Sequence, residues 1–428
     1  LRPSQCLLAT NSFSKSILIQ SFLLIRQTVK SDDPNIDLDL GNPDEGDSVT
    51  LGQFRDVLCR HGVASPSNPA NQIGIEFRWR DHDPNVGTAI FSSRYRNGNA
   101  GSAELDYLRI GVGEQGYTVE RRKPGVYRLQ LSNQKKPIGQ SEDFRPERSF
   151  SFSAAALATL GKPAEQIAHI GPALLHELSK IIYLGPVRKL AQRDYVWAGR
   201  MPSSIGDDGS KAIDALIASG VALQKARKTR KPAPQEANLF EQTVYWLKEM
   251  NLADGLAIKS LGNSARYGLL IENYGEQSNI KDVGVGVSQV LPVIVAALHA
   301  EPGHIVIVEE PESHLHPRAQ SVLANLIAQV SKEKSVQFIA ETHSEHLFRR
   351  MQTLVARQDL KPKDSALYFV EREKNLASLR ELEVDQVGKI KNWPESFFGD
   401  ALGETREQTK LSIQRAKELR AKNGSVSD

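Results

Sequence analysis

Two adjacent carboxylates follow a short apolar run in the last third of the chain. The run, Ile305–Val308, is followed directly by Glu309, Glu310 and Pro311. A continuous apolar run of this length is typical of a strand that is buried on both faces of a parallel sheet. Such sheets bind ligands at the carboxyl ends of their strands. At a nucleotide site the first acid would hold Mg²⁺, and the second would orient or deprotonate the water that attacks the γ-phosphate. Taken alone, the pair also fits a solvated junction between a strand and a loop.

A histidine follows the next apolar run along the chain. Residues 336–340 predict a second buried strand, and Thr342, His343 and Ser344 lie at or just after its end. A histidine at this place could contact a γ-phosphate or its attacking water and sense whether the nucleotide has been cleaved. A single histidine is more often structural, so its position beside the acid pair is what favours the functional interpretation.

A glycine-rich stretch precedes the acid pair. It runs from Asp282 to Gln289 and includes Gly284, Gly286 and Ser288, and an apolar helix is expected over 290–299. Small residues let a backbone approach a phosphate closely, and a helix N-terminus offers N–H groups and the positive end of the helix dipole. Glycine-rich stretches are common, but the short distance to the acid pair makes this one more specific.

The N-terminal residues 9–16 read Ala-Thr-Asn-Ser-Phe-Ser-Lys-Ser. A phosphate-binding loop has the pattern G-x-x-x-x-G-K-[ST] before a helix. Lys15 and Ser16 occupy the positions that contact the β and γ phosphates and Mg²⁺, respectively. The other residues expected to line this loop are Asn11, Ser12 and Ser14.

Both glycines of that pattern are replaced, by Ala9 and Ser14. Where the backbone must adopt a left-handed conformation, a residue other than glycine costs roughly 1 kcal/mol or more. Two hypotheses stay open: ATP still binds through Lys15 and Ser16, or the site is degenerate and hydrolyses poorly.

The surrounding sequence predicts the elements that position these residues. Apolar strands alternate with helices in the last third of the chain, which indicates an α/β core with a mixed, mainly parallel sheet. Residues 73–132 alternate apolar and polar side chains between turn residues, which predicts an antiparallel meander. The expected segments are 1–149 (N-terminal half of the core with the meander), 150–262 (helical insert), 263–373 (C-terminal half of the core) and 374–428 (a strand pair and a helical tail).

The order of these motifs resembles the C-terminal half of ABC-type ATPases, in the branch that contains the SMC, RecF and OLD-type ATPases. Residues 284–292, 309–317 and 341–346 carry the resemblance, together with 183–188 (Tyr-Leu-Gly-Pro-Val-Arg). They are similar to a group of predicted AAA ATPases in bacteria, and residues 387–398 are similar to that group's C-terminal domain of unknown function. The resemblance implies a P-loop NTPase fold of the ABC-ATPase type.

The resemblance also implies roles for individual residues. Glu309 would be the Walker B acid that holds Mg²⁺ with Ser16, Glu310 the catalytic glutamate, and His343 the switch histidine. The stretch 285–289 would occupy the signature position, although the usual Leu-Ser-Gly-Gly-Gln is absent. The signature residues expected to bind the γ-phosphate held by a second copy of the chain are Gly286, Ser288 and Gln289.

The function implied is therefore an ATP- and Mg²⁺-dependent homodimer that closes around nucleotide and hydrolyses it, acting in DNA maintenance or anti-phage defence. The alternative is a non-hydrolysing scaffold, gated by ATP, that recruits an effector such as a nuclease or a toxin. DNA is a possible partner through the basic clusters 121–123 and 225–231, although such clusters are usually solvated surface.

Gln53, Arg188 and a set of three acids are less specific candidates for functional residues. Gln53 is the best candidate for a glutamine that links the metal to the second lobe, and it also fits a surface turn. Arg188 could reach a phosphate, pair with a carboxylate across the lobes, or be structural. An intrinsic nuclease would need acids such as Glu371, Glu383 and Asp385, but too little chain follows them for a nuclease domain.

Composition limits the classes of partner and the cellular compartment that we expect for this chain. The net charge of +3 does not create a basic field that requires a nucleic-acid partner. Two cysteines exclude a disulfide framework and favour a reducing cytoplasm. No apolar stretch is long enough to span a membrane. Because the chain begins with Leu1 close to the first predicted strand, we expect a further strand upstream.

Overall fold

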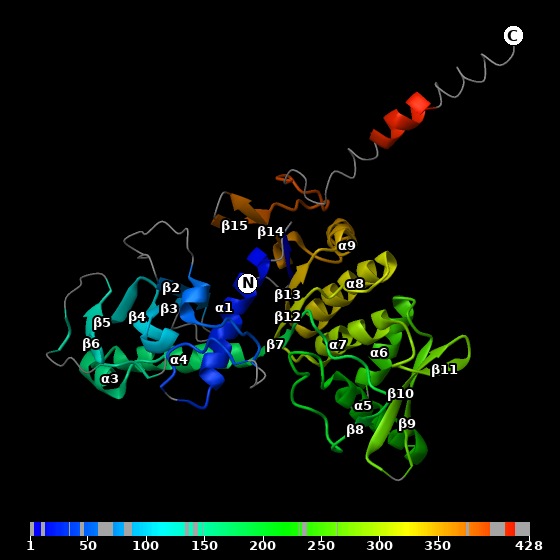
Figure 1. Cartoon of the computed structure of the whole chain (residues 1–428), viewed down its shortest axis with the longest axis horizontal. Helices are drawn as coiled ribbons and strands as arrows, with labels where there is room; N and C mark the ends of the chain where they lie inside the picture. The colour runs from blue at the N-terminus through cyan, green and yellow to red at the C-terminus, as the bar shows by residue number, and fades with distance from the viewer. Residues whose placement is uncertain are drawn as a thin grey trace.

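A six-stranded sheet lies at the centre of the molecule and includes strands from both ends of the chain (Figure 1). The computed structural model describes residues 4–9, 13–33, 35–42, 47–58, 72–80, 88–132, 137–139, 144–147, 149–230, 232, 238–262, 264–373, 376–393 and 407–415. The strand order is β15-β14-β1-β13-β12-β7. The strands are β1 (Ser4–Ala9), β7 (Ile181–Leu184), β12 (Ile305–Glu309), β13 (Gln337–Thr342), β14 (Ser365–Glu373) and β15 (Leu376–Leu382). All neighbours pair in parallel except β15, which is antiparallel to β14.

Both faces of this sheet are covered. In β12, Ile307 belongs to one hydrophobic core, whereas Val306 and Val308 belong to the other. Successive side chains of a strand point to opposite faces, so a strand between two cores must be apolar at every position. This explains why residues 305–308 form a continuous apolar run.

The first core lies between the sheet and the N-terminal lobe, to the left in Figure 1. It contains α1 (Phe13–Lys30) and α4 (Ala164–Ser179), together with α2 (Phe54–Val57) and α3 (Ala154–Leu160). A five-stranded antiparallel meander completes this lobe, in the order β2-β3-β4-β5-β6. Its strands are β2 (Gln72–Arg80), β3 (Thr88–Asn97), β4 (Ala103–Val112), β5 (Gln115–Lys123) and β6 (Val126–Leu131).

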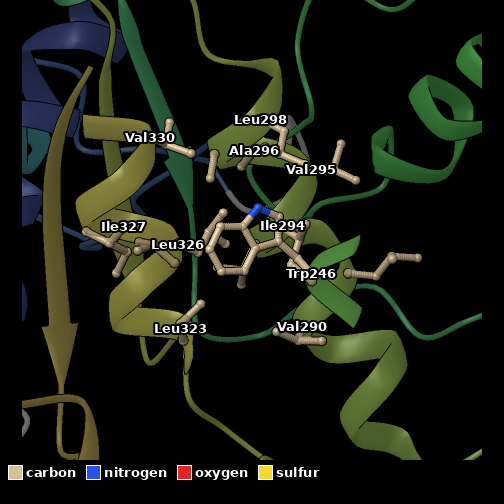
Figure 2. Packing of buried hydrophobic residues seen from close by; sticks show 14 of the residues in the cluster. Trp246, Val290, Ile294, Val295, Ala296, Leu298, Leu323, Leu326, Ile327 and Val330 are labelled. Atoms are coloured by element: carbon tan, nitrogen blue, oxygen red, sulfur yellow. The ribbon is translucent and has the colours of Figure 1, made fainter. Parts of the chain in front are cut away.

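The second core lies on the other side of the sheet and is mainly helical. Figure 2 shows the indole of Trp246 on α6, surrounded by aliphatic side chains of α7 and α8. The helices are α5 (Ala212–Thr229), α6 (Asn238–Glu249), α7 (Val285–His299), α8 (Pro317–Lys334) and α9 (Glu345–Ala356). A small sheet of β8 (Tyr195–Val196), β9 (Gly255–Ser260), β10 (Arg266–Asn273) and β11 (Glu276–Asn279) packs against them.

The predicted fold class is confirmed: the chain is α/β, with a mixed, mainly parallel core sheet, an antiparallel meander and a helical insert. Residues 407–415 of the expected tail are helical, and none of the described helices is long and apolar enough to cross a bilayer. The division into four segments stays a prediction.

Two segments differ from expectation. The segment 150–260 was expected to be mainly helical, but it also contains three strands: β7, an edge strand of the core sheet, and β8 and β9 of the small sheet. The glycine-rich stretch was expected to be a loop before a helix at 290, but α7 already begins at Val285. Gly286 and Ser288 therefore lie in the first turn of that helix.

Candidate functional site

The acid pair lies at the carboxyl end of β12. Glu309 is the last residue of the strand, is paired with Glu341 of β13 and is 7% exposed. The amide of Glu310 donates a 2.8 Å hydrogen bond to the carbonyl of Glu341, which continues the pairing by one residue. Beyond this bond the chain turns away from the sheet.

That turn begins with an uncommon backbone conformation. Glu310 has a φ of 43°, in the left-handed region that residues other than glycine seldom adopt. Its carbonyl accepts the amide of Ser313 at 3.1 Å, and its carboxylate Oε2 accepts the Ser313 hydroxyl at 3.0 Å. Residues other than glycine persist in this region where the surrounding structure holds them, as at helix ends, turns and functional sites.

Tyr183 of β7 contacts the first acid directly. Its hydroxyl donates a 2.6 Å hydrogen bond to Oε1 of Glu309. Burial, and next the negative charge of Glu309, raise the pKa of the Tyr183 phenol above its ordinary value. The phenol therefore keeps its proton at neutral pH and remains the donor in this pair.

Arg188 reaches the backbone of both acids. Its Nη2 donates to the carbonyl of Glu309 at 2.6 Å and to that of Glu310 at 3.1 Å. The side chain is 4% exposed, and burial lowers the pKa of its guanidinium to about 10. The group is therefore still a cation at neutral pH. Sequence reasoning had left the target of Arg188 open, and the structure places it on these carbonyls.

The neighbouring strand end carries His343. Its amide donates a 2.7 Å hydrogen bond to Oε1 of Glu312, and its side chain is exposed. The hydroxyl of Thr342 accepts the amide of Ser344, and Ser344 in turn caps α9 through the amide of Leu347, both at 2.9 Å. The structure thus brings His343 to the same sheet edge as the acid pair, as the sequence predicts.

The phosphate-binding candidate, residues 9–16, follows a strand that ends at the same sheet edge. β1 is paired with β13 in parallel, so Ala9 ends at the same sheet edge as Glu309. The backbone of Lys15 and Ser16 lies in the first turns of α1. Asn11 and Ser12 lie outside the described residues, as do the side chains of Ser14, Lys15 and Ser16.

The start of α7 packs against the turn that follows the acid pair. A β-carbon added to Gly286 would lie 2.7 Å from the carbonyl oxygen of His314, so only glycine fits there. Val285 is 45% exposed, Ser288 is half-buried and donates to the carbonyl of Val285 at 2.9 Å, and Gln289 is 6% exposed. Of the three signature candidates, Gln289 thus lies on the buried face of the helix.

A cleft of about 1900 Å³ opens beside this site. Tyr183 and the residues 185–187 line one side of it, and residues of α1, including Arg26 and Lys30, line another. Gln53 is exposed, begins α2 and lies on the rim of the cleft. The cleft therefore connects the helix that follows the phosphate-binding candidate with the segment that contacts the acid pair.

The acids considered for a nuclease lie elsewhere and have structural partners. Glu371 pairs with Arg380 at 2.8 Å, and Asp385 accepts the amides of Val387 and Lys389 at 2.9 and 2.8 Å. Glu383 is exposed. Within the described ranges, no three such side chains come together in a way that would hold a metal ion.

Sequence reasoning did not assign a role to Tyr183. A signal was present: residues 181–184 form a short apolar run that is followed directly by Gly185 and Pro186, as expected for a buried strand that ends in a turn. The run is too short to be distinguished from a helix by periodicity alone, and it follows a helix.

Two family models match parts of the chain. Residues 219–348 match the family model described as an AAA ATPase domain, and residues 360–408 match a protein family of unknown function, DUF3696. The first match includes Gly286, both acids and His343. No curated protein matches the sequence.

The structure is also similar to solved SMC head domains. One, bound to the C-terminal winged-helix domain of ScpA, is 12% identical, with a TM-score of 0.42 over 89% of this chain and 90% of that one. Another, bound to the C-terminal domain of ScpA and derived from Pyrococcus furiosus, is 10% identical, with a TM-score of 0.42 and the same coverage. A third, from Thermotoga maritima, is 10% identical, with a TM-score of 0.33 over 89% and 90%.

Proposed function

We propose that this chain is an ATP-binding and ATP-hydrolysing head of the ABC type, which closes around nucleotide together with a second copy of itself. The match of residues 219–348 to an AAA ATPase domain supports ATP as the ligand. The observation that carries the proposal is the convergence of three parallel strand ends at one sheet edge: β1 with the start of α1, β12 with the acid pair, and β13 with His343.

The spacing at this edge suits a polyphosphate. Neighbouring strands lie about 4.8 Å apart, so β1 and β12, with β13 between them, are separated by about 10 Å. A triphosphate on the N-terminus of α1 would reach from Lys15 toward Glu309. The backbone N–H groups and the positive dipole end of the helix favour an anion at this place.

The residues on both sides fit Mg²⁺. Glu309 supplies a carboxylate at the strand end and Ser16 a hydroxyl at the start of α1, and hard oxygen ligands of this kind are those that Mg²⁺ prefers. When bound, Mg²⁺ would neutralise charge that develops on the β and γ phosphates. Only a few protein ligands are needed, because Mg²⁺ keeps several waters in such sites.

The chemistry of the chain itself follows from the geometry of the turn. Glu310 leaves the sheet just past Glu309, and its carboxylate is oriented by the hydroxyl of Ser313. From there it would accept a proton from the water that attacks the γ-phosphate. The exposed side chain of His343 would contact the γ-phosphate and respond to its departure.

A second copy would complete the site. Gly284 and Val285 at the start of α7 are exposed, and the next residue, Gly286, packs against the turn that follows Glu310. In a symmetric dimer this helix N-terminus would face the γ-phosphate held by the partner. Gly286 and Ser288 lie in the same first turn, whereas Gln289 would support it from its buried position.

A Glu310→Gln variant tests the proposal. It keeps the shape of the side chain and removes the base, so we expect binding of ATP with loss of turnover and accumulation of a dimer. Light scattering with ATP, with ADP and without nucleotide measures the dimer, and phosphate release measures turnover. Glu383→Gln, an exposed position outside the site, is the control. An oligomeric state that does not change with ATP would contradict the proposal.

The second candidate function is an ATP-gated scaffold that dimerises without turnover and recruits an effector such as a nuclease or toxin. The replacement of both loop glycines by Ala9 and Ser14 favours it. Dimerisation of the wild-type chain on ATP with no phosphate release would identify the scaffold. In either case we place the protein in DNA maintenance or anti-phage defence, in the cytoplasm.

A further inference from the structure

The residues 183–188 link the edge strand β7 to the acid pair at two points, and the proposed function gives them no role. We propose that this segment, here called the brace, positions both acids for catalysis: Arg188 holds the peptide of Glu310, and Tyr183 orients the carboxylate of Glu309. The inference rests on the proposed function, and it adds two positioning residues to that site.

The first argument is the backbone of Glu310. A left-handed φ of 43° is unfavourable for a glutamate and persists only where neighbouring groups hold it. One guanidinium nitrogen of Arg188 donates to the carbonyls on both sides of this residue, at 2.6 Å to Glu309 and 3.1 Å to Glu310. Bonds from a charged donor are stronger than those between neutral groups. Arg188 thus fixes the turn that aims the Glu310 carboxylate.

The second argument is that burial of the Arg188 guanidinium is unfavourable for the free energy of folding. Arg188 is 4% exposed, and its strongest electrostatic support comes from Glu312. Within the described part of the chain, its Nε and Nη1 have no hydrogen-bond partner, and neither does Oε2 of Glu312. A buried charge with unused donors lowers the free energy of unfolding. At a purely structural position a hydrophobic side chain would give a more stable fold. A functional constraint explains its presence.

The third argument is the fit of Tyr183. Its hydroxyl donates to one carboxylate oxygen of Glu309 at 2.6 Å, which fixes the direction of the second oxygen. A β-carbon on Gly185 would lie 3.1 Å from this hydroxyl, so the glycine leaves the space that the phenol occupies. Tyr183 therefore acts on the carboxylate of Glu309, whereas Arg188 acts on the backbone carbonyls of both acids.

The brace is also tied to the helix that carries Lys15. The amide of Gly185 donates to the carbonyl of Asp207 at 2.8 Å. The carboxylate of Asp207 accepts the hydroxyl of Ser48 and lies 3.7 Å from the guanidinium of Arg26 on α1. The phosphate-binding helix and the acid pair thus share one chain of contacts through the brace.

The test uses the full chain with three variants. Arg188→Lys keeps the charge but replaces the rigid, planar guanidinium, whose Nη2 reaches both carbonyls, with an ammonium on a flexible stem. Tyr183→Phe removes only the hydroxyl. Arg266→Lys is the control, because Arg266 of β10 pairs with Asp194 on the surface of the small sheet. Each variant is measured by kcat and KM for ATP, by thermal melting, and by hydrogen exchange of the peptide 305–316.

We expect Arg188→Lys to lower kcat about 10- to 100-fold with little change in KM, because a misplacement of about 1 Å has effects of this size. Tyr183→Phe should lower kcat about 10-fold, since loss of one orienting hydrogen bond disturbs a single carboxylate. Arg188→Lys should raise exchange in 305–316, and it should cause no further loss in a Glu310→Gln background. The control should match the wild type.

An unchanged kcat and unchanged exchange in Arg188→Lys would overturn the inference, as would a loss of thermal stability with an unaffected kcat. Failure of the proposed turnover gives a different result: the wild type and Glu310→Gln would then release phosphate at the same rate. In that case the exchange of 305–316 still decides whether Arg188 positions the turn.

Discussion

Leu7 and Glu309 lie at the same level of the central sheet, because each is paired with Glu341 on the strand between them. The chain leaves β1 after Ala9 and leaves β12 after Glu309, so two segments from opposite ends of the sequence emerge at one edge. This register would let a lysine near the N-terminus and an acid pair in the last third of the chain serve one nucleotide, as proposed. It also gives the phosphate-binding candidate a defined position, at the start of α1.

Restoring the glycines of residues 9–16 should tighten ATP binding. Ala9 ends β1 and Ser14 lies in the first turn of α1, so the gain would come from closer approach of the backbone to the phosphates and not from a left-handed conformation. A gain of roughly 1 kcal/mol corresponds to about fivefold in affinity. We therefore expect Ala9→Gly with Ser14→Gly to lower the Kd for ATP by about fivefold or more. Calorimetric titration of the variant and the wild type measures this difference.

Ser21→Gly is the matched control, because it adds the same residue to α1 away from the loop. It should leave the Kd for ATP unchanged, although the glycine weakens the helix by about 1 kcal/mol. If the double glycine variant bound ATP no more tightly than the wild type, residues 9–16 would not be the phosphate-binding loop.

Gly286→Ala should disturb the turn that follows the acid pair. The added methyl group would lie 2.7 Å from the carbonyl oxygen of His314, and a backbone atom cannot move aside cheaply. We expect the free energy of unfolding to fall by about 1–3 kcal/mol, as in other overpacked sites. Urea denaturation without nucleotide measures the effect on the monomer.

Gly284→Ala provides the comparison, since nothing lies within 4 Å of a β-carbon at that position and its φ is −56°. The free energy of unfolding should change by less than about 0.5 kcal/mol. Equal destabilisation by both substitutions would show that the contact with His314 does not decide the outcome, because alanine by itself favours a helix more than glycine does.

The sequence predicted the elements whose signal is local. Glu309 at the end of a buried strand follows from the apolar run before it, and helix α3 at 154–160 from its own composition. The start of α7 was placed too late, because glycines suggest a loop even where, as at Gly286, close packing requires them in a helix.

The contacts of Tyr183 and Arg188 could not be predicted in the same way. They depend on β7 pairing with β12, a contact between segments more than a hundred residues apart, which no local pattern encodes. Short apolar runs such as 181–184 fit a strand or part of a helix equally well. Only the pairing of β7 with β12 shows that the segment after β7 contacts the acid pair.

Trp246 should contribute strongly to stability through the second core. It is 5% exposed and lies among side chains of α7 and α8, including Ile294 and Leu326 (Figure 2). Replacement of a buried tryptophan by alanine removes these contacts and leaves a cavity, which costs about 3–5 kcal/mol. Circular dichroism during urea denaturation of Trp246→Ala measures the loss.

Lys248→Ala is the control, because Lys248 lies on the exposed face of the same helix. Its substitution should cost about 1 kcal/mol or less. A comparable loss from both variants would mean that the helix itself, and not the packing of Trp246, is being weakened.

His299 should make stability depend on pH. It lies in the last turn of α7, where burial lowers the pKa of its imidazole below the ordinary value of 6.5. The imidazole of His304 and the ammonium of Lys334 lower the pKa of His299 further, whereas Glu301 opposes them. Burial is the largest of these effects, so the folded protein holds this proton less tightly than the unfolded chain.

The sign of the effect follows from proton linkage. Below pH 6.5 the unfolded chain binds a proton at His299 that the folded protein does not, so the free energy of unfolding decreases as the pH falls. The loss begins near the unfolded pKa and stops below the folded one. His299→Gln should therefore lose less stability than the wild type between about pH 7 and about pH 5. His346→Gln, at an exposed position, should follow the wild type. Parallel pH profiles of the wild type and His299→Gln, measured by urea denaturation, would contradict this assignment.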